Sequence, residues 1–257
     1  MTADDPLPVA DPWEPLRRTT QARIGLHRSG FGVSTNDVLH FAADHAAARD
    51  AVHSPMDTGA VGKGLQELGF GGPVVVRSQA GSRAEYLRRP DLGRLPADLS
   101  SVQPTGADIG IVVADGLSAA AVDAHAVALV DSLTSALAPH FSIAAPVIAT
   151  GARVALGDHI GAALGVEMVI VIIGERPGLS VADSLGIYLT YAPKPGRVDS
   201  QRNCISNIHP PDGLGYGDAA RIVAALATGA RRLGASGVTL KDTSAALTPP
   251  AGQFELP

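Results

Sequence analysis

Residues 108–150, DIGIVVADGLSAAAVDAHAVALVDSLTSALAPHFSIAAPVIAT, contain the pattern that decides the fold. A short run of isoleucine and valine comes first, an alanine-rich stretch follows Ser118, and a second short apolar run closes the segment. Short apolar runs are typical of buried strands, and a serine before an apolar-periodic stretch is typical of a helix N-cap. The segment therefore predicts a strand, a helix capped by Ser118 and a second strand.

The same alternation continues towards the C-terminus. We expect a helix in GDHIGAALG (157–165), strands in EMVIVIIGE (167–175) and LGIYLTYAP (185–193), a helix in YGDAARIVAALATGARRLG (216–234) and a last strand in VTLKD (238–242). Strands that alternate with helices form mostly parallel sheets covered on both faces. We predict an α/β fold with a doubly wound, mostly parallel sheet as the domain over 105–244.

A smaller, mainly helical region is predicted over 17–104. We expect helices in VSTNDVLHFAADHAAARDAVH (33–53), VGKGLQELG (61–69) and SRAEYLRRP (82–90), with a strand in VVVRS (74–78). Residues 34–36 can cap the first helix, whose apolar positions, among them Val38, Phe41 and Val52, lie mostly on one face. Segments 1–16 and 245–257 lack periodicity and are predicted to be disordered tails.

Composition narrows the classes of protein. The chain has 257 residues, 46% of them hydrophobic, and a formal charge of −5, which disfavours a dedicated nucleic-acid binder. Cys204 is the single cysteine, so no internal disulfide can form. The N-terminus lacks the pattern of a secretory signal, and we expect a cytoplasmic protein without a membrane span.

Several familiar motifs fail in detail. In TGAVGKGL, Gly64 stands where a phosphate-binding loop needs Ser or Thr, and the turn at Ser118 lacks the glycine spacing of a nucleophile elbow. The histidines show no paired metal-ligand spacing, so no metal site is expected on this chain alone. As a nucleophile, Cys204 would have only Arg202 and His209 nearby in the sequence.

Candidate binding residues follow the predicted strands, because ligands of such sheets collect beyond the strands' carboxyl ends. The loops there are ADGLS (114–118), GERPGLS (174–180) and the segment from APKPGR to RNCISN (192–207). We expect Gly174 to let another molecule approach the backbone, with Glu175 and Arg176 projecting from a rigid turn. The alternative is that both side chains simply face water.

These segments together resemble the small subunit of ethanolamine ammonia-lyase, an adenosylcobalamin-dependent family. The matching segments are ARIGLHRSG, FAADHAAARDAVHSP, YLRRPDLGR, DIGIVVADGLSAAAV, RVALGDHIGAALG, VIIGERPGLSVADSLGIYLTYAPKPGR, RNCISNI and GVTLKD. They extend from about residue 20 to 242. HRSG (27–30) departs from the GRAG-like turn that is more common in the family.

The resemblance implies that Val154, Glu175 and Cys204 contact the cofactor, and Arg176 and Asn203 are suited to donate to its amide or phosphate oxygens. It also implies a large barrel subunit that holds ethanolamine, and a radical conversion of ethanolamine to acetaldehyde and ammonia. No catalytic residue is expected on this chain, since the cofactor performs the difficult step. Enclosure in a bacterial microcompartment stays open.

Two other classes of function remain as alternatives. The first is a self-sufficient α/β enzyme with Cys204 as nucleophile or Asp115 as acid or base. The second is a non-catalytic scaffold or regulatory subunit that leaves cobalamin untouched. Activity of the chain without a partner would favour the first alternative. A complex that turns over without any contact between this chain and cobalamin would favour the second.

Overall fold

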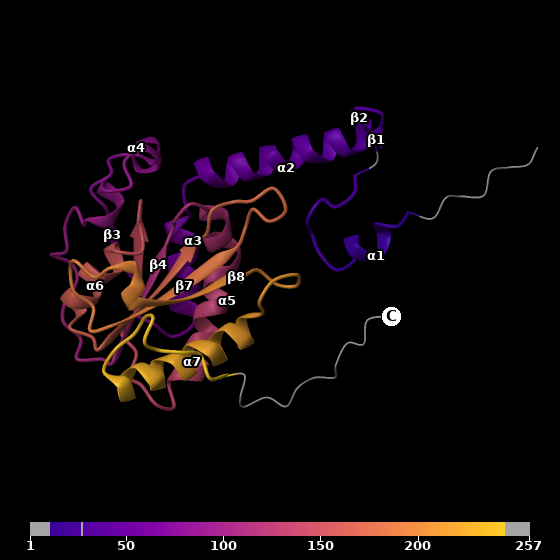
Figure 1. The fold of residues 1–257 in the computed structure, drawn as a ribbon. Helices are drawn as coiled ribbons and strands as arrows, with labels where there is room; N and C mark the ends of the chain where they lie inside the picture. The colour runs from indigo at the N-terminus through magenta and orange to yellow at the C-terminus, as the bar shows by residue number, and fades with distance from the viewer. Residues whose placement is uncertain (1–10, 27, 245–257) are drawn as a thin grey trace, which may run out of the picture.

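The computed structural model describes residues 11–26 and 28–244, arranged around a central six-stranded sheet (Figure 1). Its strand order is β3-β5-β4-β6-β7-β8. The strands are β3 (Val74–Arg77), β4 (Ile109–Ala114), β5 (Val147–Thr150), β6 (Met168–Gly174), β7 (Leu185–Tyr191) and β8 (Arg202–Ile208). The first four in spatial order are parallel to one another, whereas β7 and β8 are antiparallel additions at one edge. The predicted α/β fold with a mostly parallel sheet is confirmed.

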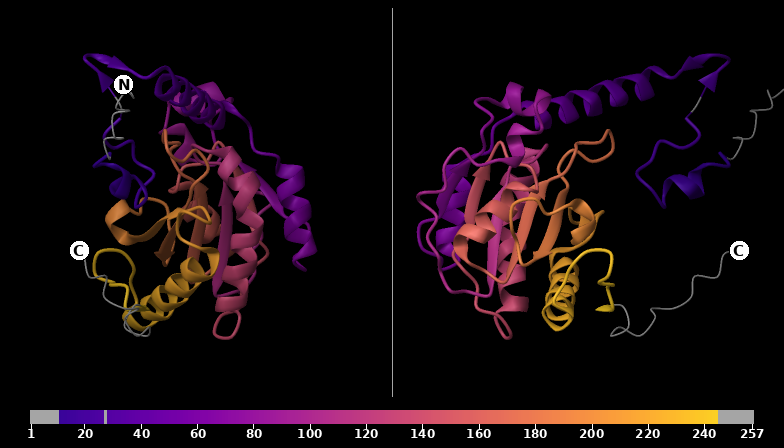
Figure 2. Two further views of the ribbon diagram at one scale, coloured as in Figure 1. Left: turned by 90° about the vertical axis from the view of Figure 1, so that its right-hand side faces the viewer. Right: turned by 60° about the vertical axis from the view of Figure 1, so that its left-hand side comes forward.

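Helices cover both faces of this sheet. They are α3 (Thr58–Glu67), α5 (Ala119–Leu137), α6 (Leu156–Leu164) and α7 (Tyr216–Leu233), whereas the short helix α4 (Arg83–Arg88) follows β3 in the chain. Helices α3, α5 and α7 pack on one face, where α5 and α7 lie side by side (Figure 2), and α6 packs on the other. Alternate residues of β4 enter opposite cores: Ile111 faces α5, and Val112 faces α6. Two apolar cores therefore hold the strand ends in fixed positions.

Local sequence accounts for the helix ends. The Ser118 side chain accepts a hydrogen bond from the Ala121 N–H and so caps α5, as predicted. Gly165 and Gly234 follow α6 and α7 in the left-handed conformation, with φ of 67° and 69°, where glycine avoids the strain of a side chain. Helix α5 is long and apolar enough to cross a membrane, but it is the core helix of this domain.

Three expectations about elements need correction. The segment VTLKD (238–242) forms no strand. RNCISNI, expected within a loop, is strand β8, which pairs with β7. Strand β3 does not stay within a separate helical region, because it pairs with β5 and becomes an edge of the main sheet. The sheet therefore combines strands from both sides of the boundary predicted near residue 104.

The N-terminal segment forms an arm beside the sheet domain (Figure 1). It consists of α1 (Glu14–Arg17), the short hairpin of β1 (Arg28–Ser29) and β2 (Gly32–Val33), and α2 (Thr35–His53). Ser34 caps α2, but Ala51 is the only buried residue of this helix, so the predicted apolar face does not pack into a core. The described part of the first predicted tail includes α1, and residues 1–10 and 245–257 lie outside the described residues.

Candidate functional site

A hollow of about 420 Å³ opens beyond the carboxyl ends of β4, β5 and β6. Strand-end residues and two tyrosines line it: Tyr86, Gly116, Leu117, Arg153, Val154, Ile173, Gly174, Glu175, Arg176 and Tyr188. Three of the predicted contact residues, Val154, Glu175 and Arg176, thus share one hollow although they come from two different loops. This location is where ligands of α/β sheets bind.

Close packing of two glycines forms the floor of this hollow. A Cβ atom at Gly174 would lie 2.0 Å from the Ser118 carbonyl oxygen, and one at Gly116 would lie 2.2 Å from the Gly174 carbonyl oxygen. No side chain fits at either distance. The chain's own backbone therefore occupies the space that a side chain at Gly174 would take, while Gly174 itself still lines the hollow.

Asp115 ties the end of β4 to the end of β5. Its carboxylate accepts hydrogen bonds from the Gly151 N–H (2.8 Å) and the Ala152 N–H (2.9 Å), and Arg83 lies 3.3 Å away. Burial raises the pKa of the Asp115 carboxyl, while these two N–H groups and Arg83 act in the opposite direction. Because both oxygens are engaged, Asp115 has a structural role and does not line the hollow.

Glu175 is half-buried, and one of its oxygens is engaged within the chain. Its Oε2 accepts hydrogen bonds from the Ser184 hydroxyl (2.7 Å) and the Asn207 N–H (3.3 Å). These bonds orient the carboxylate and leave Oε1 to accept a donor from a ligand. Its neighbour Arg176 is exposed, and no carboxylate of the described residues forms an ion pair with it.

Cys204 adjoins the hollow through Tyr188, its direct partner across the antiparallel pair of β7 and β8. Cys204 is an exposed residue of β8. Neighbouring atoms nevertheless partly desolvate its sulfur and so raise the pKa of the thiol, a hydrogen bond with Tyr188 opposes this, and the nearby Glu175 adds to it. Burial likewise raises the pKa of Tyr188, to about 12. His209 bonds to the Asn207 side chain at 2.9 Å. The cysteine thus lacks the lowered pKa that a nucleophile needs.

Asn203 is not brought to the hollow. Adjacent residues of a strand point to opposite faces, so Asn203 points away from the face of Cys204. Its amide donates to the carbonyl oxygens of Gly237 (3.2 Å) and Leu240 (3.1 Å), and its oxygen accepts from the Gly237 N–H (2.7 Å). The Asn203 side chain therefore anchors the segment that was predicted to be the last strand.

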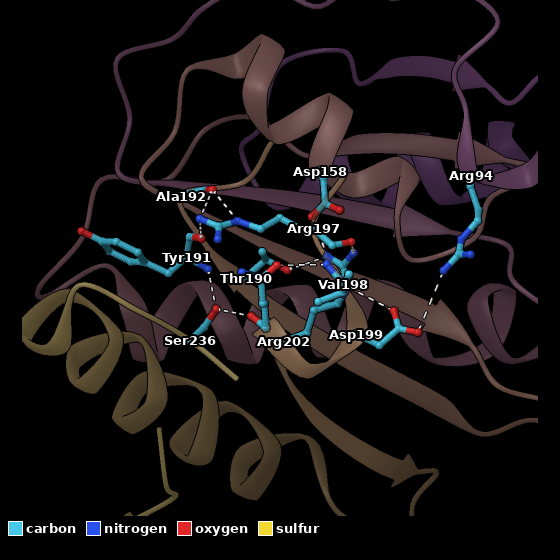
Figure 3. Close-up of polar contacts among 11 residues, drawn as sticks. Arg94, Asp158, Thr190, Tyr191, Ala192, Arg197, Val198, Asp199, Arg202 and Ser236 are labelled. Atoms are coloured by element: carbon cyan, nitrogen blue, oxygen red, sulfur yellow. Dashed lines mark hydrogen bonds and ion pairs between the residues drawn. The ribbon is translucent and has the colours of Figure 1, made fainter. Parts of the chain in front are cut away.

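A buried ion pair connects the two elements on either side of the site (Figure 3). Arg202 of β8 lies 2.6 Å from Asp158 of α6, and both side chains are almost fully buried. The same guanidinium donates to the Thr190 hydroxyl (3.1 Å) and the Arg197 carbonyl (2.9 Å). The pair fixes β8, which carries Cys204, relative to α6, which begins just after Val154.

Sequence reasoning missed three residues of the hollow: Tyr86, Arg153 and Tyr188. Arg153 directly precedes Val154, and this position next to a predicted contact was its one available signal. Tyr86 comes from α4, and no pattern in the sequence indicated that α4 lies beside the strand ends. Tyr188 could be recognised only once β8 was known to pair with β7.

The other hollows of the described residues do not bring the predicted contact residues together in this way. A larger one, about 880 Å³, lies between α5 and α7, away from the carboxyl ends of the strands, and is lined largely by small or polar side chains. Within 11–26 and 28–244, no group of three His, Cys, Asp or Glu side chains could hold a metal ion. We therefore place the candidate site at the strand ends, where three of the five predicted contact residues gather.

Comparison with known proteins identifies the family of this chain. The family model for the ethanolamine ammonia-lyase light chain matches residues 10–241. The ethanolamine ammonia-lyase small subunit of Rhodococcus erythropolis is 60% identical over 243 residues, which cover 95% of each chain. Those of Bradyrhizobium diazoefficiens and Ralstonia nicotianae are 50% and 45% identical over 95% and 94% of this chain, and over 96% and 92% of their own length. The chain belongs to the family of ethanolamine ammonia-lyase light chains.

Proposed function

We propose that this chain forms one wall of an adenosylcobalamin site that a large, barrel-type subunit completes. The observation that carries the proposal is the convergence of Val154, Glu175 and Arg176 in one hollow at the strand ends. With the partner, the complex would convert ethanolamine to acetaldehyde and ammonia. The chain would act in the cytoplasm, either free or inside a bacterial microcompartment.

The residues of the hollow suit an amide-rimmed, apolar ligand. Val154 and Ile173 offer apolar surface, Glu175 can accept hydrogen bonds from amide N–H groups, and Arg153 and Arg176 can donate. A volume of about 420 Å³ suits a small organic ligand and is too small for a whole cobalamin. The hollow can therefore hold only an edge of the cofactor, so a second chain must supply the remainder of the site.

The chemistry would belong to the cofactor. When bound, adenosylcobalamin supplies the radical that abstracts hydrogen from the substrate. The residues of this chain would bind and orient the cofactor, and they would exclude water from it. Tyr188 and Cys204 fit that role, because desolvation by neighbouring atoms raises the pKa of the half-buried tyrosine and of the exposed cysteine, and both are uncharged near neutral pH.

Co-purification with the large subunit tests the proposal. The complex should turn over ethanolamine only with adenosylcobalamin, and this chain alone should be inactive. Activity of the isolated chain would contradict the proposal and favour a self-sufficient enzyme. Unchanged cobalamin affinity in all variants of the hollow would instead favour a scaffold subunit.

Cys204→Ala tests the contact of the cysteine. We expect cofactor affinity to fall by about 1 kcal/mol, the loss of one packed contact, with turnover retained at saturating cofactor. Equilibrium binding and turnover of the assembled complex measure the two effects separately. Complete loss of turnover in a correctly assembled complex would indicate chemistry at the sulfur.

A further inference from the structure

The guanidinium of Arg153 has no anionic partner among the residues that the structure describes. Its Nε is buried and makes no hydrogen bond with any described residue. None of the ion pairs among described residues includes it. A buried cationic donor without an acceptor is unfavourable, and such a group in a native protein calls for a ligand that completes it.

The neighbouring Arg83 shows the contrast. Both guanidinium groups stack on the buried Tyr86 ring, Arg153 at 4.5 Å and Arg83 at 5.0 Å from its centroid. Arg83 is nevertheless engaged with the Asp115 carboxylate (3.3 Å) and the Gly116 carbonyl (2.8 Å). Tyr86 thus stacks with two cations. The Nη2 of Arg83 also lacks a partner, but its Nε and Nη1 have acceptors, whereas the Arg153 guanidinium has no acceptor among the described residues.

The position of Arg153 is fixed before any ligand binds. The backbone N–H of Arg153 donates to the Gly93 carbonyl oxygen at 2.8 Å. A Cβ at Gly93 would lie 2.9 Å from the Arg153 Cγ, so the stem of the side chain packs directly on this glycine. Arg153 also borders both the 420 Å³ hollow and an adjoining one of about 400 Å³. The guanidinium is therefore preorganised at the boundary of two hollows.

The charge balance of the 420 Å³ hollow favours an anion. Glu175 is its only carboxylate, and Ser184 and the Asn207 N–H already engage one of the two oxygens. Arg153 and Arg176 both line the hollow, and neither forms an ion pair with an acid among the described residues. A guanidinium fork matches the oxygens of a phosphate group better than it matches a single amide oxygen.

We infer that Arg153 binds a phosphodiester group. This inference rests on the proposed cobalamin site, and it assigns the nucleotide tail of that cofactor to the side of the hollow where Arg153 lies. Cobalamin carries one phosphodiester, in that tail. Cobinamide is the same corrin without the tail, and so the two corrins differ in the group that Arg153 would recognise.

The test compares cyanocobalamin and cobinamide binding to the assembled complex by equilibrium ultrafiltration. We expect Arg153→Met, which keeps an unbranched stem on Tyr86, to weaken cyanocobalamin binding by roughly tenfold or more and to leave cobinamide binding unchanged. Arg153→Lys keeps the positive charge but loses the planar pair of guanidinium donors. Its cyanocobalamin affinity should fall by less than that of Arg153→Met, and its cobinamide affinity should stay unchanged. If the Met variant does not assemble, the Lys variant decides the question.

Arg94→Met is the matched control. Arg94 lines the adjoining hollow and faces Asp199 at 3.9 Å, so its loss removes the same charge nearby without removing the unpartnered donor. Both corrins should bind to this variant as to the wild type. Equal losses for both corrins in Arg153→Met, or no loss, would overturn the inference. A wild-type complex that binds neither corrin would overturn the proposed function itself.

Discussion

At the residue scale, the surroundings of Cys204 disfavour its thiolate. The residue is exposed, but partial desolvation of its sulfur and the nearby Glu175 raise the pKa of the thiol, and the hydrogen bond with Tyr188 opposes this only in part. A raised pKa means a smaller thiolate fraction near neutral pH, and alkylation requires the thiolate. Iodoacetamide should therefore react with this chain more slowly than with free cysteine at pH 7–8.

The measurement is the alkylation rate as a function of pH, with a cysteine peptide as the control. Cys204 is the only cysteine, so the label reports one site. The midpoint of the rate should lie at a higher pH than that of the peptide, and bound cobalamin should slow the reaction further in the complex. A midpoint below the peptide's would mean an activated thiol and would revive the nucleophile alternative.

Gly174→Ala is a second prediction at this scale. A methyl group there would meet the Ser118 and Asp115 carbonyl oxygens at 2.0 and 2.7 Å, both of which are backbone and cannot swing away. We expect the variant to lose at least about 2 kcal/mol of unfolding free energy, as overpacked sites do. Gly217→Ala, in the first turn of α7 with nothing within 4 Å of the added methyl, should keep or slightly raise stability. Denaturant unfolding distinguishes the two, and equal stabilities would contradict the packing argument.

At the scale of elements, the Arg202–Asp158 pair fixes β8 relative to α6. Arg202→Met would leave the buried Asp158 carboxylate without its cation, which should cost about 3–5 kcal/mol. The double variant Arg202→Met with Asp158→Leu should recover much of this loss, because it removes the uncompensated charge as well. Denaturant unfolding of the purified chain measures both.

Arg231→Met is the control for that prediction. Arg231 pairs with Asp108 and Glu167 on the surface, where its side chain is 37% exposed. Ion pairs in water contribute little, so this variant should change stability by less than about 1 kcal/mol. If Arg202→Met proved as mild as Arg231→Met, the buried pair would not hold the two elements together.

The Arg202–Asp158 pair also shows how far the sequence could predict the structure. Local patterns were sufficient for α5, α6 and the parallel strands, because caps, terminal glycines and apolar periodicity act within a few residues. Strand β8 was missed because its polar residues satisfy partners distant in the chain: Arg202 reaches α6, and Asn203 holds Gly237 and Leu240. VTLKD fails as a strand for a related reason, since Asn203 bonds to its backbone where a sheet neighbour would otherwise pair.

Some residues of the candidate site could likewise be predicted from the sequence, and others could not. The strand-end loops, and with them Val154, Glu175 and Arg176, could be expected from the rule that ligands bind at the carboxyl ends of parallel strands. Tyr86 and Arg153 could not, because their stacking depends on how α4 packs against the end of β5. Such contacts between distant segments leave no periodic signal in the chain.

At the scale of the whole molecule, the N-terminal arm lies on the side of the proposed cofactor site (Figure 1). Arg23 donates to the Leu179 carbonyl (3.2 Å), and the Ser180 hydroxyl donates to the Gln21 carbonyl (3.2 Å), so the arm contacts the loop that follows Glu175. Large apolar side chains of the arm remain exposed: Phe31, Val38, Leu39 and Phe41. Three of them lie on α2 and Phe31 lies in the turn of the adjoining hairpin, and exposed apolar groups close together in the chain indicate a protein interface.

A large subunit that completes the hollow would reach this arm, so we predict that α2 is part of that interface. Leu39, which is 62% exposed, makes little contact within the chain, and Leu39→Ser should leave its thermal unfolding nearly unchanged. Binding to the large subunit, measured by titration or co-purification, should weaken by roughly tenfold for a buried leucine at an interface centre. Leu233→Ser, at the far end of α7 and 52% exposed, is the matched control and should assemble normally. Equal assembly of both variants would exclude the Leu39 surface from the interface, whereas a self-association defect in Leu39→Ser without its partner would assign that surface to a second copy of this chain.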